Sequence, residues 1–154
     1  MRFLVIDDSM PMRRIVANVL ARLGHTDVLM AANGREAMKR IESDQIDFVI
    51  TDWFMPEMSG LEFLRKVRDN PSTRDVPIVI ITANASSDDV AQAVRLRVNG
   101  YVLKPFTAEL LKARIASICA SLTTPDPCES ADAAGASPLP LVDANPLTQS
   151  VQVA

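Results

Sequence analysis

Four short apolar runs in this chain each lead into a residue with a charge or a hydroxyl group. The runs are 3–6, 48–51, 78–81 and 101–103. The residues that follow them are Asp7 with Asp8, Asp52, Thr82 and Lys104, respectively. Short runs rich in Val and Ile are typical of buried parallel strands. This pattern favours an open parallel sheet with a site along one edge.

Helical periodicity fills the stretches between these runs. Apolar residues recur at helical spacing from Pro11 to Gly24, in 34–43, 60–69 and 87–97, and after a cap at Thr107. A weaker apolar run at 28–31 lies between the first two strands. The alternation predicts a (βα)5 chain of the α/β class. Right-handed crossovers make this a doubly wound, five-stranded parallel sheet of the flavodoxin-like kind, with strand order 2-1-3-4-5.

In such a sheet a ligand binds where the strand order reverses, between the first and third strands. Asp7, Asp8 and Asp52 end those two strands, so we expect their carboxylates to meet there. Clustered carboxylates repel unless a cation joins them, and hard oxygen ligands suit Mg²⁺. Lys104 and Thr82 suit phosphate oxygens, and a carboxylate can accept a phosphoryl group. The sequence therefore predicts an Mg²⁺ site at which Asp52 is phosphorylated.

Charge is distributed unevenly along the chain. Residues 1–122 carry 16 Lys+Arg and 15 Asp+Glu, whereas residues 123–154 carry four acids and no base. The first part lacks the basic bias of a nucleic-acid-binding domain, so no nucleic acid partner is expected. No apolar run approaches the length of a membrane span, and no signal peptide is recognised. We therefore expect a soluble, cytoplasmic protein without membrane insertion.

The composition changes after residue 122. Residues 123–154 contain five of the ten prolines, several Ala and Ser, and no aromatic residue. This composition predicts one folded domain, 1–122, followed by a disordered acidic tail, 123–154. The Leu and Val residues of the tail leave open a weak docking segment, but a passive tail is the favoured interpretation.

The motifs resemble those of the response regulator receiver domain, in particular the single-domain receivers of chemotaxis. They are Asp7-Asp8, 51–60, 81–83 and 100–106, and the likeness covers residues 2–120. The resemblance implies that Asp52 accepts phosphate from a histidine kinase. It implies that Asp8 and Asp52 bind Mg²⁺ directly, together with the backbone carbonyl of Phe54, while Asp7 holds a metal-bound water.

The resemblance also implies a switch. Lys104 and Thr82 would contact the phosphoryl group, and Tyr101 would report its presence to the surface. Thr82 would move toward the phosphoryl group, and the exposed ring of Tyr101 would swing into the vacated space. The output face would then be formed by the fourth helix, the fifth strand and the fifth helix.

Three residues depart from the family pattern. Phe54 and Asn84 each stand two residues after a site residue, where well-known members carry Asn and Glu. Both flank the path of hydrolytic water, so the lifetime of the phosphorylated form is not predicted. Arg97 stands where Gly is usual near the end of the fourth helix. A side chain there disfavours a left-handed C-cap, so we expect a differently built helix end.

The function predicted from these features is that of a stand-alone receiver: a monomeric switch and not a metabolic enzyme. The first hypothesis is chemotaxis, with the phosphorylated form binding a partner such as the flagellar motor switch. The second is a phosphorelay intermediate that passes phosphate to a histidine phosphotransferase. A phosphohydrolase with an aspartyl nucleophile is disfavoured, because such enzymes carry Asp-x-Asp after the first strand and Asp7-Asp8-Ser9 lacks that spacing.

Overall fold

A computed structural model describes residues 1–123. Its five strands form one parallel sheet in the order β2-β1-β3-β4-β5, which confirms the predicted fold class. The strands are β1 (Phe3–Ile6), β2 (Val28–Ala31), β3 (Phe48–Asp52), β4 (Ile78–Thr82) and β5 (Gly100–Leu103). The predicted tail lies outside the described residues from 124 onward, so its disorder stays a prediction.

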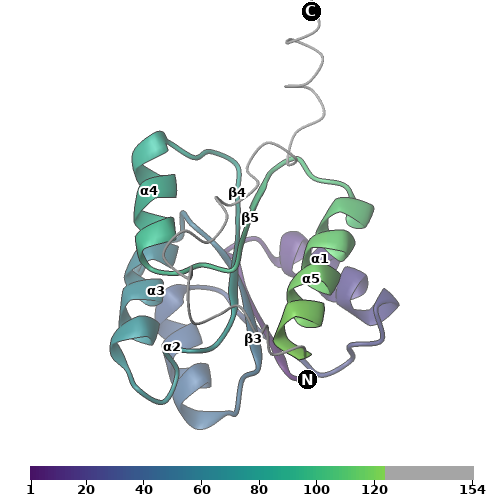
Figure 1. The fold of residues 1–154 in the computed structure, drawn as a ribbon, viewed down its shortest axis with the longest axis horizontal. Helices are drawn as coiled ribbons and strands as arrows, with labels where there is room; N and C mark the ends of the chain where they lie inside the picture. The colour runs from purple at the N-terminus through teal and green to yellow at the C-terminus, as the bar shows by residue number, and fades with distance from the viewer. Residues whose placement is uncertain (124–154) are drawn as a thin grey trace, which may run out of the picture.

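Five helices connect and flank the strands. They are α1 (Met10–Arg22), α2 (Gly34–Ser43), α3 (Gly60–Asp69), α4 (Ser87–Arg95) and α5 (Ala108–Thr123). In Figure 1, α1 and α5 cover one face of the sheet, and α2, α3 and α4 cover the other. Capping residues set several helix starts: Ser59 and Ser86 form capping boxes, and the Thr107 hydroxyl accepts from the Leu110 N–H at 3.1 Å.

The hydrophobic core is divided by the sheet into two layers. Successive residues of a strand point to opposite faces, so Leu4 and Ile6 belong to one layer while Phe3 and Val5 belong to the other. The first layer joins the sheet to α2, α3 and α4, and the second joins it to α1 and α5. Strands buried on both faces explain the continuous apolar runs of the sequence.

The end of α4 differs from the expectation drawn from Arg97. Leu96 is the C-cap, and Arg97 itself takes the left-handed conformation, with φ of 54°. The Val98 N–H donates to the Ala93 carbonyl at 3.3 Å, and the Arg97 N–H donates to the Val94 carbonyl at 3.0 Å. These two bonds define a Schellman motif. The expected change of helix end is therefore wrong: the usual end is kept, and the arginine bears a backbone cost of about 1 kcal/mol.

Arg68 of α3 holds this helix end in place. Its guanidinium donates to the backbone carbonyls of Leu96 at 2.9 Å and Arg97 at 3.0 Å. It also donates to the carbonyls of Arg74 and Val76, both at 2.8 Å. One side chain therefore joins the end of α4 to the loop that leads into β4. These segments lie at the amino edge of the sheet, where the strands begin.

Candidate functional site

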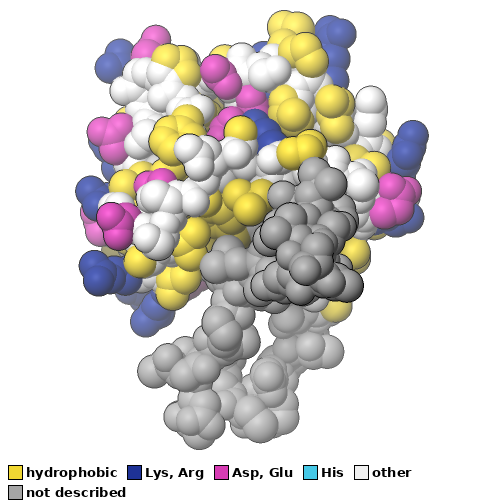
Figure 2. Space-filling model, turned by 90° about the horizontal axis from the view of Figure 1, so that it is seen from above, with side chains coloured by type: hydrophobic (Ala, Val, Ile, Leu, Met, Phe, Trp, Pro, Cys, Tyr) yellow, Lys and Arg dark blue, Asp and Glu magenta, His cyan; other side chains and the backbone are white. Residues whose placement is uncertain are grey.

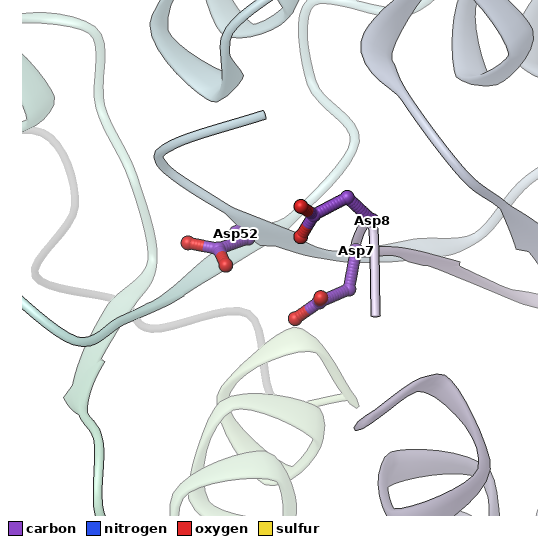
Figure 3. A group of neighbouring side chains, drawn as sticks. All are labelled: Asp7, Asp8 and Asp52. Carbon is purple, nitrogen blue, oxygen red and sulfur yellow. The ribbon is translucent and has the colours of Figure 1, made fainter. Parts of the chain in front are cut away.

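Three carboxylates meet at the opposite, carboxyl edge of the sheet. Asp7, Asp8 and Asp52 turn their side chains toward a common space beyond β1 and β3 (Figure 3). One oxygen from each lies within 4.8 Å of the others. Ile6 is paired with Thr51 across β1 and β3, so the residues after them lie at the same level. The predicted convergence of these acids at the switch point is therefore present.

Lys104 joins two of these acids. Its ammonium Nζ lies 3.0 Å from Asp7 Oδ2 and 2.8 Å from Asp52 Oδ2. Lys104 follows β5, and its backbone N–H donates to the Thr82 carbonyl at 2.7 Å. The peptide bond between Lys104 and Pro105 is cis. The lysine reaches across the ends of β4 and β3 to bridge residues that are far apart in the sequence.

Backbone groups hold the Asp52 carboxylate from the other side. Asp52 Oδ1 accepts from the Trp53 N–H at 2.6 Å and from the Phe54 N–H at 3.3 Å. Gly60 allows this close arrangement, because a Cβ at that position would collide with the Asp52 carbonyl. The Gly60 N–H donates to the Trp53 carbonyl at 2.9 Å. The carboxylate is thus fixed by donors on both oxygens, with an orientation set before any ligand arrives.

Burial and mutual charge alter the acid–base properties of the site. Burial raises the pKa of Asp7 above its ordinary value, and the charge of Asp52 adds to that rise, although the Ser9 N–H and Lys104 oppose it. Burial lowers the pKa of Lys104, but its hydrogen bonds to Asp52 and Asp7 and their charges outweigh burial and raise that pKa overall. The charged form of Lys104 is therefore favoured in the fold, whereas the charged form of Asp7 is disfavoured.

Thr82 and Tyr101 lie beside the acids but are arranged differently from the expectation. The buried Thr82 hydroxyl donates to the Asn84 carbonyl at 3.0 Å. The Tyr101 ring, expected at the surface, is only 2% exposed. It belongs to the core layer under α3 and α4, because its position in β5 points that way. Burial raises the pKa of its phenol.

The side chains of two unusual residues lie at the rim of the site. Phe54 is 52% exposed, and Asn84 is exposed as well. Figure 2, which views the carboxyl edge, has acidic side chains near its centre with hydrophobic side chains around them. Neither residue is buried within the site, so both remain at the surface through which water would enter.

Two contributors to the site escaped sequence reasoning. The Arg13 guanidinium donates to the Asp7 carbonyl, which ties the first turn of α1 to the end of β1. The buried Trp53 side chain helps to lower the pKa of Asp89, a residue of the α4 capping box, after the larger effect of Ser86. No local pattern marks an arginine or a tryptophan for such contacts, because both partners come from other parts of the fold.

The acid cluster fits a hard divalent cation. It offers carboxylate oxygens from three residues within 4.8 Å of one another, and Asp8 is exposed, which leaves room for water to complete the coordination. Soft ligands such as Cys and His are absent from this cluster. The donor chemistry therefore suits Mg²⁺ better than zinc or copper.

Fold and site together define an α/β domain with an acidic, lysine-braced pocket at its switch point. The profile of the response regulator receiver domain matches residues 3–116. A chemotaxis protein CheY homolog from Campylobacter jejuni is 44% identical over 119 residues, which cover 77% of this chain and 92% of that protein. The chemotaxis protein CheY of Pseudomonas aeruginosa is 42% identical, with 77% and 95% covered.

Solved structures agree with these matches. Chemotaxis response regulator CheY4 of Vibrio cholerae superposes with a TM-score of 0.70 at 30% identity, covering 76% of this chain and 97% of that one. The chain therefore belongs to the response regulator receiver domain family, a family of signalling proteins. Within residues 1–123 no helix has the length and apolar character needed to cross a membrane.

Proposed function

We propose that this chain is a phosphorylation-activated response regulator of chemotaxis in which Asp52 is the phosphoacceptor. The observation that carries the proposal is the placement of Asp52, which is 8% exposed, 2.8 Å from the Lys104 ammonium and clustered with Asp7 and Asp8. The names of the Campylobacter and Pseudomonas relatives support chemotaxis as the pathway. The chain acts in the cytoplasm as a monomer, receives phosphate from a histidine kinase and binds a partner such as the flagellar motor switch.

The chemistry is transfer of a phosphoryl group between two nucleophiles. The P–N bond of a phosphohistidine breaks, its electron pair stays on the histidine nitrogen, and an oxygen of Asp52 forms the new P–O bond. Asp8, Asp52 and the Phe54 carbonyl would hold Mg²⁺, and Asp7 would hold a water beside it; the cation would supply neutralising charge for the phosphoryl oxygens. Lys104 offers a second cation to those oxygens. Attack by water on phosphorus later restores the carboxylate.

Thr82 and Tyr101 carry the signal away from Asp52 in this proposal. The Thr82 hydroxyl leaves the Asn84 carbonyl and donates to a phosphoryl oxygen instead. Tyr101 is paired with Ile80 across β4 and β5, and within the described residues its buried hydroxyl has no hydrogen-bond partner. A buried hydroxyl without a partner costs free energy, so an alternative ring position is accessible at low cost. The ring would thereby reshape the surface formed by α4, β5 and α5.

The first experiment measures phosphorylation of the purified chain by a small phosphodonor with Mg²⁺, followed by intact mass. We expect one acid-labile phosphate on the wild type and none on Asp52→Asn. Asp88→Asn is the matched control, because Asp88 is exposed at the start of α4 and outside the acid cluster. A full phosphate signal in Asp52→Asn would show that the acceptor is a different residue.

The second experiment tests output with the same proteins. A partner recovered with the phosphorylated chain should bind Tyr101→Ala with little phosphorylation dependence, although Asp52 is still phosphorylated in that variant. Unchanged dependence would exclude the tyrosine from the switch. Return of the phosphate to a histidine phosphotransferase, without a partner of this kind, would favour the phosphorelay alternative over chemotaxis.

A further inference from the structure

Four arginines and one acid line a groove on the side of the molecule away from the carboxylates. The groove has a volume of about 660 Å³ and lies between the end of α4 and the loop before β4. Its charged residues are Arg68, Arg74, Arg95, Arg97 and Asp75, so its lining carries an excess of three positive charges. An excess of this size in one groove indicates a place for an anionic segment, because carboxylates and guanidinium groups form well-directed pairs.

Most of these arginines are available to a ligand. Arg68 is occupied by four backbone carbonyls. Within residues 1–123, the ion pair of the Arg74 side chain is a 3.7 Å contact with Asp75, and both side chains are largely exposed. Arg95 and Arg97 are exposed and form no ion pair within residues 1–123. Three guanidinium groups therefore face solvent around a structural one, and an anion bound among them would relieve their mutual repulsion.

The described chain ends near this groove. The groove residues near the end of α4 lead directly into β5. Ile118 of α5 lies against the start of that strand, because a Cβ added to Gly100 would lie only 3.0 Å from the Ile118 side chain. α5 continues only to Thr123. Among the strands of residues 1–123, β5 stands at one edge of the sheet. A segment that leaves α5 can therefore pass around the edge of β5 to the α4 side.

The sequence that follows has the matching charge. Four acids and no base occur after Thr123, at Asp126, Glu129, Asp132 and Asp143. An extended chain covers roughly 3.3 Å per residue, so the first three acids reach about 10, 20 and 30 Å from Thr123. Neighbouring strands lie about 5 Å apart, so a reach of this order is sufficient to pass around one edge strand. Charge, length and point of departure all favour this segment over an acidic peptide of another protein.

We propose that residues 126–143 of the chain dock through their carboxylates in the groove lined by Arg74, Arg95 and Arg97. The docking is intramolecular, so a tether of a few residues keeps the acids at a high effective concentration near the arginines. Each exposed pair contributes little, and the interaction is screened by salt. The docked fraction should therefore fall as the ionic strength rises.

The test uses a paramagnetic label on the native Cys128, which lies between two of the acids. Cys119→Ala removes the other thiol, and amide signals of the full chain are recorded by NMR with the label oxidised and reduced. We expect broadening of the amides of Arg74, Arg95 and Asn99 at about 0.01 M salt. It should disappear at about 1 M salt, where the Debye length has fallen from roughly 30 to roughly 3 Å.

Matched variants test whether the groove arginines and the acids after Thr123 cause this broadening. Arg74→Gln with Arg95→Gln should abolish the broadening, and so should neutralising the four acids as Asn or Gln. Arg35→Gln with Lys39→Gln removes two exposed charges of α2 outside the groove and should leave the broadening intact. Broadening confined to the end of α5, or unchanged in the Arg74→Gln/Arg95→Gln variant, would overturn the proposal. Broadening seen only between labelled and unlabelled copies would overturn it too, in favour of docking to a second copy.

Discussion

At the carboxyl edge of the sheet, three carboxylates share one ammonium group, whereas at the amino edge one guanidinium group is shared by four backbone carbonyls. The acids of the first group repel one another, and burial raises the pKa of Asp7. The Arg68 side chain of the second satisfies carbonyls that would otherwise lack partners at a helix end and in a loop. A crowded charge cluster indicates function, while a fully bonded charge indicates structure.

Arg68→Met provides the largest test of this contrast. It removes four hydrogen bonds, two of them part-buried, and leaves carbonyls of Leu96 and Val76 without a donor. At roughly 1.5 kcal/mol for each part-buried bond to a charged group, the free energy of unfolding should fall by about 3 kcal/mol. Urea unfolding measures this change.

Arg65→Met is the matched control for that measurement. Arg65 lies on the same helix and is exposed, and within residues 1–123 its side chain makes one hydrogen bond, at 3.2 Å to Gln92. Its loss should change the free energy of unfolding by no more than about 0.5 kcal/mol. Equal effects of the two substitutions would mean that the Arg68 bonds add nothing beyond an ordinary surface arginine.

Asp7→Asn tests the carboxyl edge. It should raise the free energy of unfolding, whereas Arg68→Met should lower it. Asn keeps an oxygen for the Ser9 N–H, which donates to Asp7 Oδ1 at 2.8 Å, but removes a buried charge. In metal-free buffer at neutral pH, the free energy of unfolding should rise on the order of 1 kcal/mol. Asp8→Asn, at an exposed position, should change it less. A less stable Asp7→Asn protein would contradict the view that this cluster is strained.

The pH dependence of that gain follows from the raised pKa of Asp7. Because the pKa of Asp7 is raised in the fold, protonation of Asp7 favours the folded state. The stability that this protonation contributes is fully present below the ordinary pKa of 3.8 and is lost as pH rises through the raised pKa of the folded state. The advantage of Asp7→Asn should therefore be largest at neutral pH and shrink as pH falls toward 3.8. Unfolding curves of the two proteins at matched pH values check the trend.

Arg97→Gly should give a gain in stability of similar size at the amino edge. Arg97 has φ of 54°, a conformation that glycine adopts without a clash. The substitution should raise the free energy of unfolding by about 1 kcal/mol. Arg95→Gly is the control, because Arg95 lies within α4, where glycine costs about 1 kcal/mol relative to alanine. Opposite shifts in melting temperature are expected, and shifts of the same sign would refute the backbone argument.

The difference between the two edges also explains which features were predictable. Asp7, Asp52 and Lys104 follow apolar runs, and the strand order alone brings strand ends together, so their meeting could be predicted. Arg68 acts through carbonyls 6 to 29 residues away, and no local pattern marks such acceptors. The burial of Tyr101 depends on which face of an edge strand α4 covers. Arg97 takes a left-handed conformation that residues with a side chain disfavour, because the contacts around the end of α4 outweigh that preference.

Removal of residues 124–154 should have the smallest effect on stability. Residues 1–123 supply buried side chains to both core layers, and Leu111, Ile115 and Ile118 of α5 are buried among them. If the acidic segment docks in the arginine groove, its exposed ion pairs contribute only about 0–1 kcal/mol each before screening. The truncated chain should melt within a few degrees of the full chain at about 0.15 M salt and converge with it at about 1 M.

Asp52 of the truncated chain should be phosphorylated as before, because the acid cluster is at the opposite edge of the sheet. A large drop in melting temperature that persists at high salt would instead show apolar docking by the Leu and Val residues that follow Thr123.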